Sequence, residues 1–176
     1  MMKKLLMTAV VILLLLIAVT VVCRYLGSQL PEEHQIVQMA QFRVPPDSVW
    51  SALTDYTAYP LWRRGVSAVE LMPLREGLPV WREYDNRGQK MSFQVSAMDP
   101  PRQLVIEIID QDTPYTGSWE FFIEPIDQGC AITITERGRI HHNIMRFVMH
   151  KVIGLDKTVK AYVRDLEQRF TPPAAQ

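Results

Sequence analysis

Hydrophobic and polar residues follow two different periods along this chain. Between residues 35 and 138, apolar and polar positions alternate in short runs, which is the pattern of half-buried β-strands. Between residues 143 and 170, apolar residues recur every three or four positions, which is the pattern of a helix with one dry face. The pattern therefore predicts an α+β domain in which the strands come first and a long helix comes last.

The C-terminal helix is predicted over 143–170. Asn143 can cap its start, and Pro172-Pro173 prevents its continuation. Gly154 lies inside it at a cost of about 1 kcal/mol relative to alanine, so we expect a kink or break there. The segment 144–152 is apolar on nearly every side, and we expect it to act as a gate that lifts to admit a ligand. The apolar stripe of the whole helix comprises Val148, Val152, Leu155, Val159, Tyr162, Leu166 and Phe170.

The strands are predicted to form one antiparallel sheet. The first strand begins at residue 35, and Pro45-Pro46 ends it. Asp47 or Ser48 can cap a short helix, and a second helical turn follows over 56–62. Six further strands, separated by Gly, Pro, Asn or Asp turns, are predicted over 66–71, 80–84, 91–98, 104–109, 117–124 and 130–138. A twisted sheet of about seven strands must curl, and the long helix is the element able to cover its concave face.

The N-terminal run 5–23 is apolar and long enough for a helix to cross a hydrocarbon core. A cleaved signal peptide is the alternative, but its apolar region would be shorter and would end in small residues. Bulky Val22 before Cys23 also argues against a lipoprotein site. We therefore expect an uncleaved membrane anchor. Lys3 and Lys4 precede the run, so the folded domain is expected on the non-cytoplasmic side, which is the periplasm in a bacterium.

The predicted organisation is an anchor at 1–25, a linker at 26–34, one domain at 35–171 and a tail at 172–176. The chain has 19 Lys and Arg residues and 19 Asp and Glu residues. This balance gives no general attraction to nucleic acid, and we expect no nucleic-acid partner. Protein partners are not predicted by any feature of the sequence.

The sequence contains no clear motif for binding a metal or a cofactor or for nucleophilic catalysis. Cys23 and Cys130 are expected to be free thiols. His141 and His142 are adjacent, so on a strand they point to opposite faces and cannot easily share one ion. No zinc motif, glycine-rich phosphate loop or nucleophile motif is present, and we expect neither a metal nor a cofactor.

Several stretches together resemble a known family. They are residues 42–50 (FRVPPDSVW), 53–56 (LTDY), 59–62 (YPLW), 117–121 (GSWEF), 132–138 (ITITERG) and the final helix. This set resembles helix-grip (START-like, SRPBCC) proteins, a family often labelled polyketide cyclase/dehydrase and lipid transport. The resemblance spans residues 35–170. It implies a curved sheet wrapped on a long C-terminal helix, with an internal cavity that holds an apolar or amphiphilic small molecule. It supplies no catalytic set.

Glu136 is the candidate polar residue of such a cavity. If Ile132 and Ile134 face inward, the period of a strand sends Glu136 inward as well. There it would serve as a polar handle or as a general acid or base. The favoured interpretation is instead a structural ion pair with a nearby arginine at the strand end. The arginines considered as partners are Arg63, Arg64 and Arg139.

Large aromatic residues are the other candidate ligand contacts, because they offer a wide contact area. They are Trp62, Trp81, Phe93, Tyr115, Trp119 and Phe147. Packing alone could equally place them in the core, which is the favoured role for Trp119. Three functions remain open: a membrane-tethered module that binds a lipid-like molecule, a cyclase or dehydratase that uses Glu136, and a structural protein with a filled core. The binding module is preferred.

Overall fold

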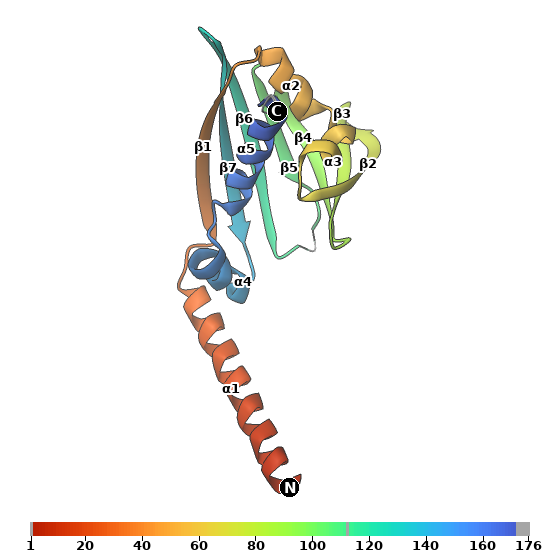
Figure 1. Ribbon diagram of the computed structural model, residues 1–176. Coiled ribbons are helices and arrows are strands. Elements are labelled where there is room, and N and C mark those ends of the chain that lie inside the picture. Colours follow the sequence, from red (N-terminus) through yellow and green to blue (C-terminus); the bar gives the residue numbers. More distant parts are fainter. Residues whose placement is uncertain (1, 112, 172–176) are drawn as a thin grey trace, which may run out of the picture.

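The computed structural model describes residues 2–111 and 113–171 (Figure 1). The N-terminal helix α1 (Met2–Ser28) leads into strand β1 (Glu33–Phe42). The helical segments α2 (Pro46–Thr54), η1 (Tyr56–Ala58) and α3 (Tyr59–Trp62) follow. The next strands are β2 (Val66–Arg75), β3 (Leu78–Asp85), β4 (Lys90–Asp99), β5 (Gln103–Ile108), β6 (Tyr115–Ile126) and β7 (Gly129–Ile140). The C-terminal segments are α4 (Asn143–Val148), the π-helix η2 (Met149–Ile153) and α5 (Lys157–Phe170).

The strands form one seven-stranded antiparallel sheet in the order β1-β7-β6-β5-β4-β3-β2. Strands β2 to β7 are consecutive neighbours, as expected for a meander, and β1 adds to the free edge of β7. The predicted α+β class and the seven-stranded antiparallel sheet are confirmed. Each predicted strand is present, although most extend by a few residues at one or both ends. Turns set these ends: Gly77 and Gly88 have φ of 79° and 76°, values that favour glycine.

Helix α5 lies across one face of the sheet (Figure 1). Its residues Val159 and Leu166 are fully buried, and on β7 Ile132 and Ile134 are also fully buried. At the same face α2 buries Leu53 completely. Each such side chain stabilises the fold by about 1.5–3 kcal/mol through its removal from water. The helix and the sheet thus form one continuous core.

The C-terminal helix is broken, as the sequence predicted. The chain passes from α4 through η2 to Gly154, whose φ of 91° is incompatible with a continued helix. Because of this break, the apolar residues of α4, η2 and α5 do not form the one continuous face that was predicted. Val152, predicted to be buried on that face, is 71% exposed. The predicted Asn143 cap is wrong, because the Nδ1 atom of His142 accepts from the backbone N–H of Met145 at 3.4 Å.

Helix α2 also starts differently from the prediction. Its N-cap position is Pro45, with no side-chain cap, and Pro46 occupies the first turn. The expected caps Asp47 and Ser48 are therefore wrong. A proline at the first helical position needs no such cap for its own nitrogen, because it has no N–H to satisfy.

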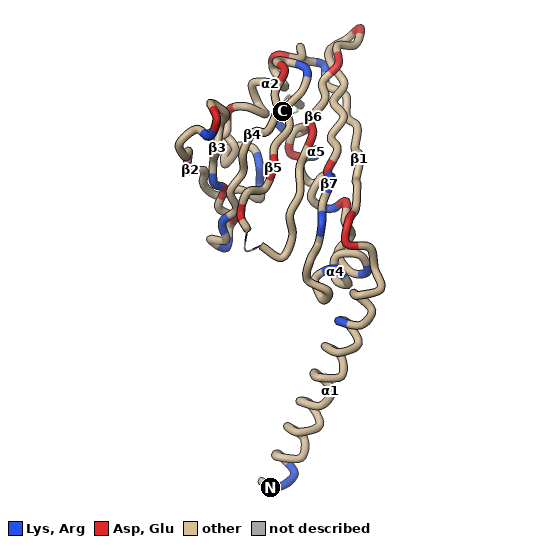
Figure 2. Tube along the Cα trace, turned by 180° about the vertical axis from the view of Figure 1, so that it is seen from behind, with Lys and Arg blue, Asp and Glu red and all other residues tan. Residues whose placement is uncertain are grey.

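Helix α1 projects away from the domain (Figure 1), and its length and apolar composition fit either a membrane span or a signal sequence. Figure 2 shows charged residues at its two ends only. The helix extends to Ser28, so the predicted linker 26–34 is shorter than expected and β1 begins at Glu33. The predicted tail, 172–176, lies outside the described residues. Cys23 and Cys130 are free, as predicted.

Candidate functional site

A cavity of about 320 Å³ lies between the sheet and the C-terminal helical segments. Strands β1 and β3 to β7 supply one side of it, and α4, η2 and α5 supply the other. The wall is largely apolar. Phe93 on β4 and Ile106 and Ile108 on β5 line it from the sheet, and Met145 on α4 and Met149 on η2 line it from the helical side. The segment α4–η2 thus forms part of the cavity wall.

Glu136 lies on β7 and lines the cavity. The inward orientation follows from the strand period, since Ile132 and Ile134 on the same face are fully buried. Its Oε2 atom is buried and has no hydrogen-bond partner in the protein. Desolvation raises the pKa of the carboxyl from 4.5 to about 7, and hydrogen bonding by the cross-strand neighbour Trp119 offsets part of that rise.

The arginines considered as partners of Glu136 are engaged elsewhere. Arg63 pairs with Glu83 (Nη1 to Oε1, 2.6 Å), Arg64 pairs with Asp165 (Nε to Oδ1, 2.8 Å), and Arg139 pairs with Glu33. Among the described residues, no ion pair involves Glu136. The interpretation of Glu136 as half of a structural ion pair is therefore wrong, and a partly buried carboxylate is left facing the cavity.

His34 on β1 is a second polar group in the cavity. A Cβ atom on Gly138, its partner in the β1–β7 register, would overlap the imidazole, so the glycine makes room for the ring. The Nδ1 atom of His34 is buried without a partner. Burial lowers the pKa of His34 below 6.5, and the charge of nearby His150 lowers it further. The neutral imidazole is thus favoured inside the domain.

The pair Arg63–Glu83 forms a satisfied polar wall at another part of the cavity. Glu83 is only 8% exposed, and its Oε1 atom also accepts from the Trp81 indole N–H at 3.0 Å. The Arg63 guanidinium lies 4.7 Å from the ring centre of Tyr59 and 4.8 Å from that of Tyr162. These contacts fix the arginine, because a guanidinium stacks favourably on aromatic faces.

Some of the residues predicted from the sequence to contact a ligand line the cavity, and others do not. Phe93, Tyr115, Trp119 and Glu136 line the cavity. Trp62, Trp81 and Phe147 do not line it. Binding of a ligand by any of these seven residues stays a prediction.

The three residues outside the cavity have other surroundings. Trp81 is fully buried between Tyr56 and Phe93, with ring centres 4.0 Å and 5.6 Å away. Trp62 packs edge-on against the Tyr162 ring, and the residue as a whole is 9% exposed. Phe147 is half-buried on α4, two residues from both Met145 and Met149, so the helical period turns it away from the cavity.

The sequence analysis missed several cavity residues, among them His34, Arg63, Glu83 and Tyr162. One signal was available, because the inward period of the first strand places residue 34 on the face of Ile36, Gln38 and Ala40. For metal binding, the described residues include no group of three His, Cys, Asp or Glu side chains close enough to hold an ion. The Glu136 carboxyl is the group in the cavity that is placed to form a hydrogen bond with a ligand or to exchange a proton with it.

Comparison with solved structures bears on the fold. A Chromobacterium violaceum protein matches with a TM-score of 0.56 and 15% identity, over 79% of this chain and 98% of that one. Norcoclaurine synthase from Thalictrum flavum matches with a TM-score of 0.60 and 11% identity, over 78% and 86%. The Zhui aromatase/cyclase from a Streptomyces species matches with a TM-score of 0.58 and 14% identity, over 82% and 99%. At these identities the likeness shows the fold alone.

Comparison at the level of sequence identifies the family. Among curated proteins, none matches this chain. A family model described as polyketide cyclase / dehydrase and lipid transport matches residues 33–170, which is more than half of the chain. The stretches that resemble helix-grip proteins and the sheet closed by a C-terminal helix agree with this match, and the chain belongs to the polyketide cyclase/dehydrase and lipid transport family.

Proposed function

We propose that residues 33–170 bind one amphiphilic small molecule in the cavity, while α1 tethers the domain to a membrane. The observation behind this proposal is a cavity with an apolar wall that also contains unpartnered buried polar atoms. The family description, which names lipid transport beside cyclase and dehydrase activity, agrees with such a role. Lys3 and Lys4 before the apolar helix favour a domain on the non-cytoplasmic side, and protease digestion of intact spheroplasts tests that orientation.

The volume of the cavity limits the ligand. Ligand pockets in proteins span about 300–1,000 Å³. At about 320 Å³ this cavity lies at the lower end of that range. It suits a single acyl chain or a small ring system, and the two chains of a phospholipid would exceed it.

The polar atoms of the cavity indicate that the ligand carries a hydrogen-bonding group. Burying a polar atom without a partner costs about 1–3 kcal/mol, and a bound ligand that pairs with it recovers that cost. The Oε2 atom of Glu136 and the Nδ1 atom of His34 are both in this state. A hydroxyl, amine or carboxyl group beside an apolar body would satisfy them. An unsubstituted hydrocarbon would not.

Filling the cavity tests the binding function. We expect Ile108→Trp to weaken binding of a dansyl-labelled undecanoic acid at least about tenfold, because the indole would occupy the space beside Phe93. Ile126→Trp is the matched control, since Ile126 is exposed at the β6–β7 turn. Dansyl emission, measured in nonionic detergent, reports binding. Equal affinity for the two variants would contradict the proposal.

Catalysis by Glu136 is the second candidate function, and the location of this carboxyl supports it. A group inside a cavity with a pKa of about 7 can accept or release a proton at neutral pH. The test uses the molecule that co-purifies with the protein as substrate, with mass spectrometry to follow its conversion. If the domain is an enzyme, Glu136→Gln should reduce conversion about 100-fold while binding persists. Retention of the molecule without any conversion would favour the binding function.

A further inference from the structure

The end of α1 is fixed to the lid of the cavity. Most of α1 is exposed, yet Gly27 near its end is buried. A Cβ atom at this position would overlap the carbonyl oxygen of Asn143, the first residue of α4. Glycine therefore allows the backbones of α1 and α4 to touch, so the end of α1 packs directly against the domain.

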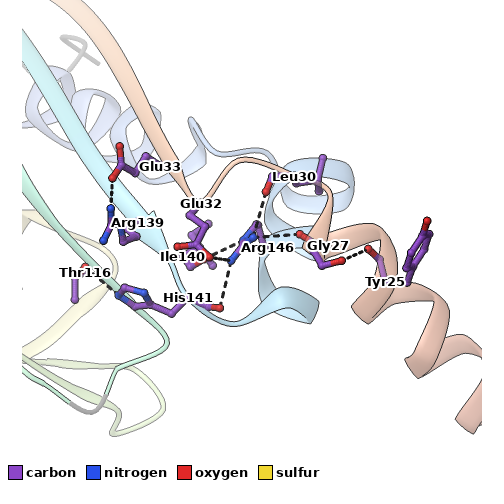
Figure 3. A network of polar contacts seen from close by, with 11 residues as sticks. Tyr25, Gly27, Leu30, Glu32, Glu33, Thr116, Arg139, Ile140, His141 and Arg146 are labelled. Atoms are coloured by element: carbon purple, nitrogen blue, oxygen red, sulfur yellow. Dashed lines mark hydrogen bonds and ion pairs between the residues drawn. The ribbon is translucent and has the colours of Figure 1, made fainter.

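Arg146 on α4 secures this junction (Figure 3). Its side chain is only 3% exposed. The Nη1 atom donates to the carbonyl oxygen of Gly27 in the last turn of α1, at 3.4 Å, and to that of Leu30 just beyond α1, at 3.2 Å. The Nη2 atom binds Glu32 Oε1 at 2.7 Å, and the Nε atom donates to Ile140 O at 3.0 Å at the end of β7. One buried guanidinium thus joins α1, α4 and the sheet.

The same helical segment closes the cavity. Met145 on α4 and Met149 on η2 face the cavity, and Arg146 between them faces α1. A π-helix and a glycine with φ of 91° follow at once. Such irregular helix geometry is frequent at functional sites, and it interrupts the ladder that would hold α4 to α5. Opening the cavity here requires movement of one short segment beside the end of α1.

With α1 spanning a bilayer, as proposed above, its length would place this segment at the bilayer surface. A helix of 27 residues is about 40 Å long, and its apolar part spans a hydrocarbon core of about 30 Å. Arg24 and Tyr25, which follow the apolar part, are residue types that favour the membrane interface. Gly27 lies less than one turn further, so α4 is held at the level of the lipid head groups. Phe147 on α4 is half-buried, and the helical period places it on the side of α4 opposite Met145, which lines the cavity.

We propose that α4 and η2 form a lid that opens into the head-group layer of the bilayer in which α1 is anchored. The amphiphile then passes directly between the bilayer and the cavity, without crossing the aqueous phase. This inference rests on the proposed binding function and adds the source of the ligand. The partner surface is the lipid bilayer, because the lid is continuous with the helix that spans it.

The first experiment locates the lid. An environment-sensitive nitrobenzoxadiazole label is placed on Phe147→Cys in a Cys23→Ala background, and the full chain is inserted into phosphatidylcholine vesicles. We expect doxyl-labelled phosphatidylcholine to quench this label. The matched control is Ile126→Cys. Ile126 is the last residue of β6 and pairs with Gly129, at the end of the twelve-residue β7 that is far from α4, roughly 40 Å away, so this label should not be quenched. Absence of quenching at position 147 would overturn the inference.

The second experiment follows the route of the ligand. Dansyl-labelled undecanoic acid is placed either in the vesicles that hold the protein or in separate vesicles, and energy transfer from tryptophan reports loading. We expect loading from the same bilayer to be at least about fivefold faster. Phe147→Asp should remove most of this advantage while affinity in detergent stays within about twofold, because Phe147 does not line the cavity. Ile126→Asp should change neither quantity.

The outcomes separate this inference from the proposed function. Equal loading rates from both sets of vesicles, with normal affinity in detergent, would overturn the membrane route and leave the binding function standing. Loss of the advantage in Phe147→Asp together with a lower melting temperature would be followed by Phe147→Leu, which should restore the rate. If the wild-type protein binds no probe in detergent, the binding function fails and the membrane route fails with it.

Discussion

The carboxyl of Glu136 should make the domain less stable as pH rises. Its pKa is raised from 4.5 to about 7 in the folded chain, chiefly by desolvation. Between these two values the folded chain therefore holds a proton that the unfolded chain has lost. Because the folded state binds more protons in this window, the free energy of unfolding falls as pH rises from 4.5 to about 7 and is level above it.

The size of the effect follows from the shift. Each pKa unit corresponds to about 1.4 kcal/mol, so the rise from 4.5 to about 7 corresponds to roughly 3 kcal/mol. Glu136→Gln keeps the shape of the side chain and cannot ionise. We expect the variant to match the wild type near pH 4 and to become more stable by up to about 3 kcal/mol above pH 8.

Urea denaturation of the full chain in nonionic detergent measures this difference. The four tryptophans, at positions 50, 62, 81 and 119, all lie in the domain, so their emission reports its unfolding. Glu124→Gln removes one exposed carboxylate and controls for the change in net charge. A stability difference between Glu136→Gln and the wild type that is constant from about pH 4 to about pH 9 would refute the reasoning. Such a result would mean that Glu136 finds a partner or water that compensates its burial.

Three other substitutions test the packing around the cavity. Arg63→Met should cost about 3–5 kcal/mol in urea unfolding, because it leaves Glu83 buried without its cation, and adding Glu83→Leu should recover part of the loss. Gly138→Ala should lower the melting temperature and displace His34, a change that would appear in the histidine resonances by NMR, whereas an unchanged spectrum would contradict the close approach. Gly154→Ala should cost about 1 kcal/mol in the same unfolding assay because its φ of 91° strains any other residue, and a neutral effect would show that the break tolerates a side chain.

Much of the fold was predictable because it depends on local periods. Alternation of apolar and polar residues, with turn residues between the runs, predicted the antiparallel meander that the structure contains. The inward orientation of Glu136 came from the same alternation along β7. Gly154 signalled the break before α5 because glycine is a poor helix residue and adopts positive φ readily. These features depend on residues that are neighbours in the sequence, so they can be predicted without knowing the contacts between distant parts of the chain.

The membership of the cavity was not predictable in the same way. Trp81 and Phe93 both face the core side of neighbouring strands, yet only Phe93 lines the cavity, since Tyr56 from η1 covers Trp81. Likewise, Glu136 avoids all three candidate arginines because each meets an acidic partner brought to it by a different element. Which side chain is covered depends on how helices and strands close over one another.

The junction between α1 and the lid shows the same division. The sequence by itself determined an apolar N-terminal helix, a meander of strands and an interrupted C-terminal helix. Only the tertiary structure decided that Arg146 meets Gly27, Leu30 and Glu32, which lie more than one hundred residues away in the chain. The physical reason is that periodicity sets which face of an element is apolar, whereas the partner of a buried charge is set by chain closure over the whole domain.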